Sequence, residues 1–82
     1  MLFYGLGNTY AQSPQEERKK ADNLFDQGQY GAACSIYDGV LTNYSKDYDV
    51  NFRYGVCLLL ARKDKEAAIM RLKYAVKSPT ID

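Results

Sequence analysis

Apolar side chains recur at spacings of three, four and seven residues along most of the chain, which is the period of helices with one buried face. This pattern predicts four helices, over residues 14–27, 30–43, 48–61 and 64–77. The third is apolar on nearly all sides, which predicts neighbours on both of its flanks. No stretch alternates apolar and polar residues between turn signals, so no hairpin is expected. The predicted fold class is therefore all-α, with antiparallel helix–turn–helix packing.

Helix start and stop signals fit these boundaries. Ser13, Pro14 and Glu16 form a helix start, because serine caps free backbone N–H groups and a carboxylate favours the positive end of the helix dipole. Gly28 ends that helix, since glycine adopts the left-handed conformation at little cost. Ser78-Pro79 ends the last helix.

The pattern of the first two helices returns in the second two. Ala21 and Gly55 are small residues within apolar helices, and nearly the same length of chain separates Ala33 from Ala68. Small residues at these points let neighbouring helices approach closely. A period of about 34 residues predicts two helix–turn–helix repeats within one domain. The domain spans residues 13–78, with repeats over about 14–45 and 47–78.

These residues resemble the tetratricopeptide repeat, which has a small residue in its first helix, Gly-x-Tyr at the turn, and an alanine, an aromatic and a leucine along its second helix. The first copy supplies Ala21, Leu24, Gly28, Tyr30, Ala33, Tyr37 and Leu41. The second copy supplies Tyr54, Gly55, Leu58, Ala68, Ile69, Leu72, Ala75 and Val76. At its turn Lys63-Asp64-Lys65 replaces Gly-x-Tyr, with one extra residue. The resemblance implies an α–α superhelix that binds other proteins.

The resemblance also implies a binding surface on the concave side, which the first helix of each repeat lines. Its residues would be Arg18, Asp22, Phe25, Phe52, Arg53, Val56 and Leu59. Arginines among aromatic and aliphatic side chains suit an extended or helical peptide. In the alternative interpretation Phe25, Phe52 and Leu59 are buried against a neighbouring helix, and the repeats only brace a larger protein. Asp22 disfavours a grip on a terminal carboxylate, because the two negative charges would repel.

Residues 1–12 have two interpretations. Leu2 to Leu6 followed by Thr9-Tyr10-Ala11 looks like the end of a signal peptide, although no basic residue precedes the apolar run. The same residues also carry first-helix spacing and predict an extra N-terminal helix; the residues at that spacing are Phe3, Leu6, Gly7 and Tyr10. The run is too short for a membrane span.

Two runs resemble, more narrowly, the N-terminal repeats of Gram-negative envelope proteins that also carry an OmpA-like domain. They are Ala21-x-x-Leu24-Phe25-x-x-Gly28-x-Tyr30 and Phe52 to Leu58. This likeness implies a periplasmic, outer-membrane-associated location, partners in envelope or secretion machinery, and further repeats or domains in a longer chain. A cytoplasmic location is the alternative. Residues 79–82 form a tail.

The amino-acid composition argues against catalysis and metal binding. The chain has no histidine, which removes the commonest general base and metal ligand, and its paired carboxylates stand at helix starts or in polar turns. The sequence therefore predicts no enzyme, no cofactor and no metal site. Cys34 and Cys57 lack CxxC spacing and are either two buried small residues or, in an exported chain, a disulfide.

The last helix is basic, although the whole chain has a net charge of only +1. Its cations are Arg62, Lys63, Lys65, Arg71, Lys73 and Lys77, opposed by Asp64 and Glu66. Arg71 and Lys73 face different sides, which favours a solvated face and leaves nucleic-acid contact as a weaker alternative. The helix also carries an apolar stripe that no later helix covers, so a neighbour is expected from the rest of the chain or from a partner; the stripe is Ile69, Leu72 and Val76.

Overall fold

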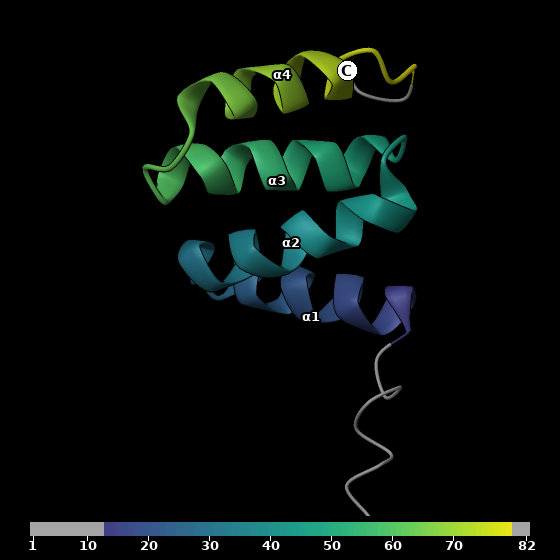
Figure 1. Ribbon diagram of the computed structural model, residues 1–82, viewed down its shortest axis with the longest axis vertical. Helices are drawn as coiled ribbons and strands as arrows, with labels where there is room; N and C mark the ends of the chain where they lie inside the picture. The colour runs from purple at the N-terminus through teal and green to yellow at the C-terminus, as the bar shows by residue number, and fades with distance from the viewer. Residues whose placement is uncertain (1–12, 80–82) are drawn as a thin grey trace, which may run out of the picture.

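The computed structural model describes residues 13–79 and confirms the all-α fold class (Figure 1). Its helices are α1 (Pro14–Asp26), α2 (Tyr30–Tyr44), α3 (Tyr48–Leu60) and α4 (Lys65–Ala75). Residues 13–79 contain no strand, and none of their helices is both long and apolar enough to cross a membrane. The two interpretations of residues 1–12 fall outside the described residues.

The four helices are stacked in chain order, each antiparallel to the one before it (Figure 1). As its apolar composition predicts, α3 lies between α2 and α4, and it also touches α1. The arrangement is two helix pairs, α1–α2 and α3–α4, laid side by side.

Side-chain caps fix where three of the helices begin. Ser13 and Glu16 form a capping box at α1, in which each side chain accepts a hydrogen bond from the backbone N–H of the other. Asp47 accepts from the backbone N–H of Val50 at α3, and Asp64 accepts from that of Ala67 at α4. The helix starts predicted at residues 14 and 48 are thus confirmed.

The two turns have the same backbone structure despite their different sequences. Gly28 has φ +78° and Arg62 has φ +57°, so both residues that follow a first helix are left-handed. The N–H of Gln29 donates to the carbonyl of Leu24 at 2.9 Å, and at the equivalent place in the second copy Lys63 donates to Leu58 at 2.8 Å. The second copy therefore keeps the turn without the glycine, and its extra residue lies after it.

Small residues lie where the helices cross. Ala21, Ala33 and Ala68 are fully buried, and Gly55 is buried against α4. A Cβ on Gly55 would stand 2.8 Å from Leu72 Cγ and 3.2 Å from the Ala68 carbonyl oxygen. The close approach predicted from these residues is therefore a property of the fold.

The apolar stripe of α4 lies partly on the surface. Ala68 and Ala75 are buried, whereas Ile69 is 41% exposed and Val76 is 69% exposed. Both lie on the flank of α4 that no other described helix covers. The structure thus places these two side chains on the surface rather than in the core.

Candidate partner-binding surface

The seven residues predicted to line a concave surface fall into two groups. Four of them come together in a cluster between α1 and α3, namely Arg18, Asp22, Phe25 and Arg53. The other three lie at spacings of four and three residues along one side of α3 and are exposed or half-buried, namely Phe52, Val56 and Leu59.

Arg18 ties the start of α3 to α1. Its guanidinium donates to Asp47 and Asp49 at 3.0 Å each and stands 3.8 Å from Asp22. It also lies 5.2 Å from the centre of the Tyr44 ring. Asp47 therefore has two roles, as the cap of α3 and as an ion-pair partner.

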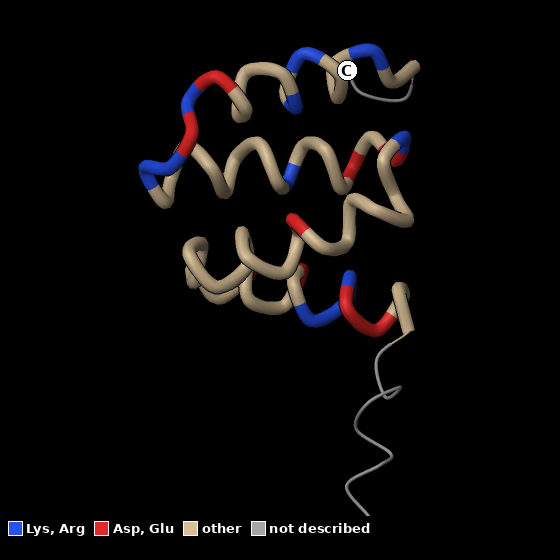
Figure 2. Tube along the Cα trace, in the orientation of Figure 1, with Lys and Arg blue, Asp and Glu red and all other residues tan. Residues whose placement is uncertain are grey.

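Arg53 makes the corresponding contacts from α3. It lies 3.4 Å from Asp26, 3.2 Å from Asp49 and 3.9 Å from Asp22, and its guanidinium is 5.1 Å from the centre of the Phe25 ring. Two arginines thus meet four aspartates, which leaves this cluster with a net charge of −2. Figure 2 shows acidic and basic positions along α1 and near the start of α3.

Asp22 also joins the cluster to the core. Its carboxylate accepts a short hydrogen bond from the Tyr37 hydroxyl, and Tyr37 is fully buried. Burial, followed by this hydrogen bond and the charge of Asp22, raises the pKa of Tyr37. The phenol therefore stays protonated and remains a donor.

The arginines are consequently occupied by the chain's own carboxylates. A ligand carboxylate would have to replace these contacts and approach a region of net negative charge. The carboxylate grip that Asp22 argues against is disfavoured further by Asp26, Asp47 and Asp49.

The remaining predicted residues belong to an apolar surface that we call the α3–α4 face. It consists of Phe52, Val56 and Leu59 from α3 and Ile69, Leu72 and Val76 from α4. Phe52 and Leu59 are 44% and 43% exposed, so neither is buried against a neighbouring helix. Phe25, in contrast, is half-buried between Tyr30 and Arg53.

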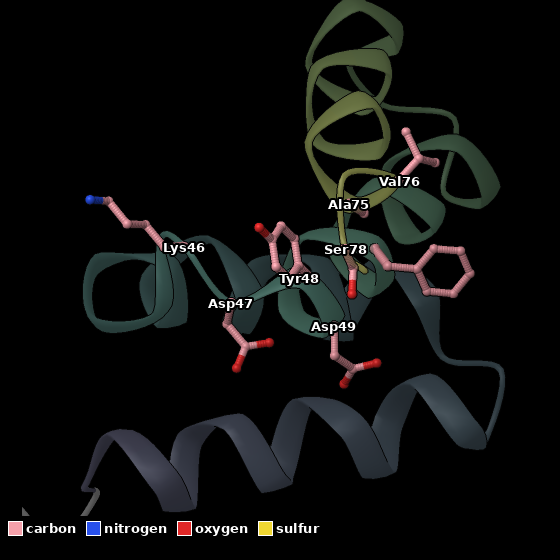
Figure 3. A pocket seen from close by; sticks show the side chains of 8 residues that line it. Lys46, Asp47, Tyr48, Asp49, Ala75, Val76 and Ser78 are labelled. Atoms are coloured by element: carbon pink, nitrogen blue, oxygen red, sulfur yellow. The ribbon is translucent and has the colours of Figure 1, made fainter. Parts of the chain in front are cut away.

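One end of the α3–α4 face opens into a cavity of about 650 Å³, shown in Figure 3. Phe52, Ala75 and Val76 supply its apolar wall, and Tyr48 stacks on Tyr74 with ring centres 5.1 Å apart. The Asp47 and Asp49 side chains point from the cavity rim toward α1 (Figure 3). Lys46 and Ser78 complete the lining.

Several residues of this surface were not predicted as site residues. Tyr48, Ala75, Val76 and Ser78 reach the cavity because the end of α4 packs beside the start of α3, and helical periodicity does not state which ends meet. For Ile69 and Val76 the sequence did carry a signal, which is the apolar stripe of the last helix that no later helix covers.

Metal and thiol chemistry have little support among the described residues. Within residues 13–79 no group of three or more histidine, cysteine, aspartate or glutamate side chains is arranged to hold a metal ion. Cys34 and Cys57 are free, buried thiols. Burial, then the neighbouring Cys34, raises the pKa of Cys57 to about 12, so its thiolate is scarce at neutral pH.

No protein-family model, curated protein or solved structure matches this chain.

Proposed function

We propose that this protein is a non-enzymatic helical module that binds another protein through the α3–α4 face. The observation that carries the proposal is that large apolar side chains from two helices remain exposed on one surface, beside a cavity of about 650 Å³. Contiguous exposed apolar surface with a polar rim is typical of protein-binding sites.

The cluster of Arg18, Asp22, Phe25 and Arg53 supports the second candidate role, which is bracing. Its ion pairs and cation–π contacts join α1 to α3, and both arginine side chains are only 26% exposed. In this proposal the predicted site divides, so that the charged residues hold the two helix pairs together and Phe52, Val56 and Leu59 contact a partner.

The envelope location, the partners in envelope or secretion machinery and the membership of a longer chain remain part of the proposal and rest on the sequence resemblance. The nucleic-acid alternative has less support, because Arg71 donates to the Asn51 side chain at 3.2 Å and is not presented to a ligand.

Affinity capture with matched variants tests the proposed function. One variant replaces three exposed residues of the face (Phe52→Ser, Leu59→Ser, Val76→Ser), and a control replaces two exposed apolar residues elsewhere (Leu60→Ser, Met70→Ser). We expect a partner that the wild type and the control retain and the triple variant loses, with the helical circular dichroism of all three alike.

Recovery of the same proteins by all three chains would refute binding at this face. Loss of the same partner from an Arg18→Ala, Arg53→Ala variant that stays folded would instead place binding at the charged cluster.

A further inference from the structure

The α3–α4 face occupies the same position in the second helix pair as the surface that the first pair uses to bind α3. The turns after α1 and α3 carry the same hydrogen bonds, so positions in the two pairs can be equated. On the first helices, Arg18, Asp22 and Phe25 correspond to Phe52, Val56 and Leu59. On the second helices, once the extra turn residue is counted, Cys34, Tyr37 and Leu41 correspond to Ile69, Leu72 and Val76.

In the first pair these positions are covered by α3. Arg18 reaches the first turn of α3, Phe25 lies under Arg53, and the Tyr37 ring is 6.5 Å from that of Tyr54. Cys34 is 2% exposed, whereas its counterpart Ile69 is 41% exposed. The first copy of the surface is thus occupied by a helix, and the second copy is open.

The opposite end of the stack is built differently. α3 meets the first pair through Val50, Tyr54 and Cys57, and the corresponding residues of α1 are Glu16, Lys20 and Asn23, all exposed. A second copy that stacked its α1 on the α3–α4 face would bury these polar groups without partners, at a cost in free energy. Head-to-tail self-association is therefore disfavoured.

Two lysines lie beside the apolar residues of the α3–α4 face on the α4 side. Lys65 and Lys73 are exposed, and neither forms an ion pair with any residue of the described range 13–79. Lys73 corresponds to Asp38, whose carboxylate accepts a hydrogen bond from Tyr54 of α3 at 3.1 Å. This position touches the covering helix in the first pair, so Lys73 is placed to touch the occupant of the second.

Charge complementarity then sets the chemistry of the partner. A lysine at this position attracts a carboxylate. We infer that the α3–α4 face binds an amphipathic helix of a partner, laid parallel to α3, with apolar residues at i and i+7 and an aspartate or glutamate at i+4. The inference rests on the proposed function and names its partner class.

Two helical peptides test the inference against the full chain. Both have an alanine–glutamine background with valines at i and i+7. Each is about 15 residues long and carries a side-chain lactam on its far face, because short helices are marginally stable alone. They differ only at i+4, which is glutamate in one and lysine in the other. Binding is measured by fluorescence anisotropy at low salt.

We expect the glutamate peptide to bind about fivefold more tightly than the lysine peptide, the scale of one exposed ion pair gained and one repulsion lost. The Lys73→Glu variant should reverse the preference. Lys19→Glu, an equal charge change on an exposed residue of α1, should preserve it. Leu59→Ser should weaken both peptides.

Other outcomes overturn the inference in distinguishable ways. If both peptides bind equally and Leu59→Ser weakens that binding, the α3–α4 face still binds a helix, but the preference for an acidic residue is refuted. Binding of neither peptide at millimolar concentration would remove the helical partner, and the capture experiment would decide the proposed function independently. A dimer in sedimentation that Leu59→Ser dissociates would make a second copy the occupant. Lys73-dependent binding of a single-stranded oligonucleotide would favour nucleic acid.

Discussion

Replacing Gly55 by alanine tests whether the α3–α4 contact has the geometry described above. The added Cβ would stand 2.8 Å from Leu72 Cγ, 2.9 Å from Leu72 Cδ2 and 3.2 Å from the Ala68 carbonyl oxygen. Leu72 Cγ is a branch atom rather than the free end of a side chain, and the carbonyl belongs to a helix backbone. The methyl group therefore forces α4 away from α3 or Leu72 out of its rotamer.

The magnitude follows from two opposing effects. Overpacking of this kind costs about 1–3 kcal/mol. Alanine in a helix interior is favoured over glycine by about 1 kcal/mol. The expected net change for Gly55→Ala is a loss of about 1 kcal/mol in the free energy of unfolding.

Gly39→Ala is the matched control, because Gly39 lies within α2 and no atom approaches its Cβ position within 4 Å. It should gain about 1 kcal/mol, the helix preference alone. In urea unfolding followed by circular dichroism, with an m-value of about 1 kcal/mol/M, the two midpoints should move about 1 M in opposite directions. A Gly55→Ala protein more stable than the wild type would refute the close contact between α3 and α4.

Three further perturbations test other parts of the structure. Arg62→Gly should raise the free energy of unfolding by about 1 kcal/mol, because glycine adopts the left-handed backbone conformation of this residue without the steric strain of a side chain. An unchanged urea midpoint would contradict the φ of +57° at this turn. Asn51→Ala should lower the free energy of unfolding by about 2–3 kcal/mol in the same assay, because the buried amide donates to the Ser45 and Asp47 carbonyls and accepts from Arg71. A loss below about 0.5 kcal/mol, which is typical of a surface substitution, would show that these groups find other partners. The melting temperature should fall as pH rises from about 9 toward 12, because burial raises the pKa of Cys57 to about 12, and burial with the Asp38 hydrogen bond raises that of Tyr54 to about 12. Over this range only the unfolded chain releases these protons, so the stability that the two groups contribute at lower pH is lost. Melting temperatures that do not fall would refute it, and Cys57→Ala should reduce the slope.

The sequence predicted the helices well because their signals are local. Ser13, Pro14, Gly28 and the apolar spacing each act within one or two turns of the chain, and the four helices begin and end close to the expected residues. Gly55 and the alanines were also identified correctly as crossing points, since the repeat period marks them twice.

The candidate site was harder to predict because it depends on which side chains meet between helices. Arg18 was expected to face a ligand, yet Asp47 and Asp49, 29 and 31 residues later, take up its donors. Periodicity places Arg18 on a face but does not give the register of α3 against α1.

The position of α4 at one end of the stack has a consequence for its local stability. α4 has a described neighbour on one side only, whereas α2 and α3 are enclosed on two. Helices with fewer buried contacts unfold locally at lower free energy, so amide hydrogens of α4 should exchange with solvent before those of α2 and α3. A ligand on the α3–α4 face would slow this exchange most in α4. Binding would then complete the ordering of this helix.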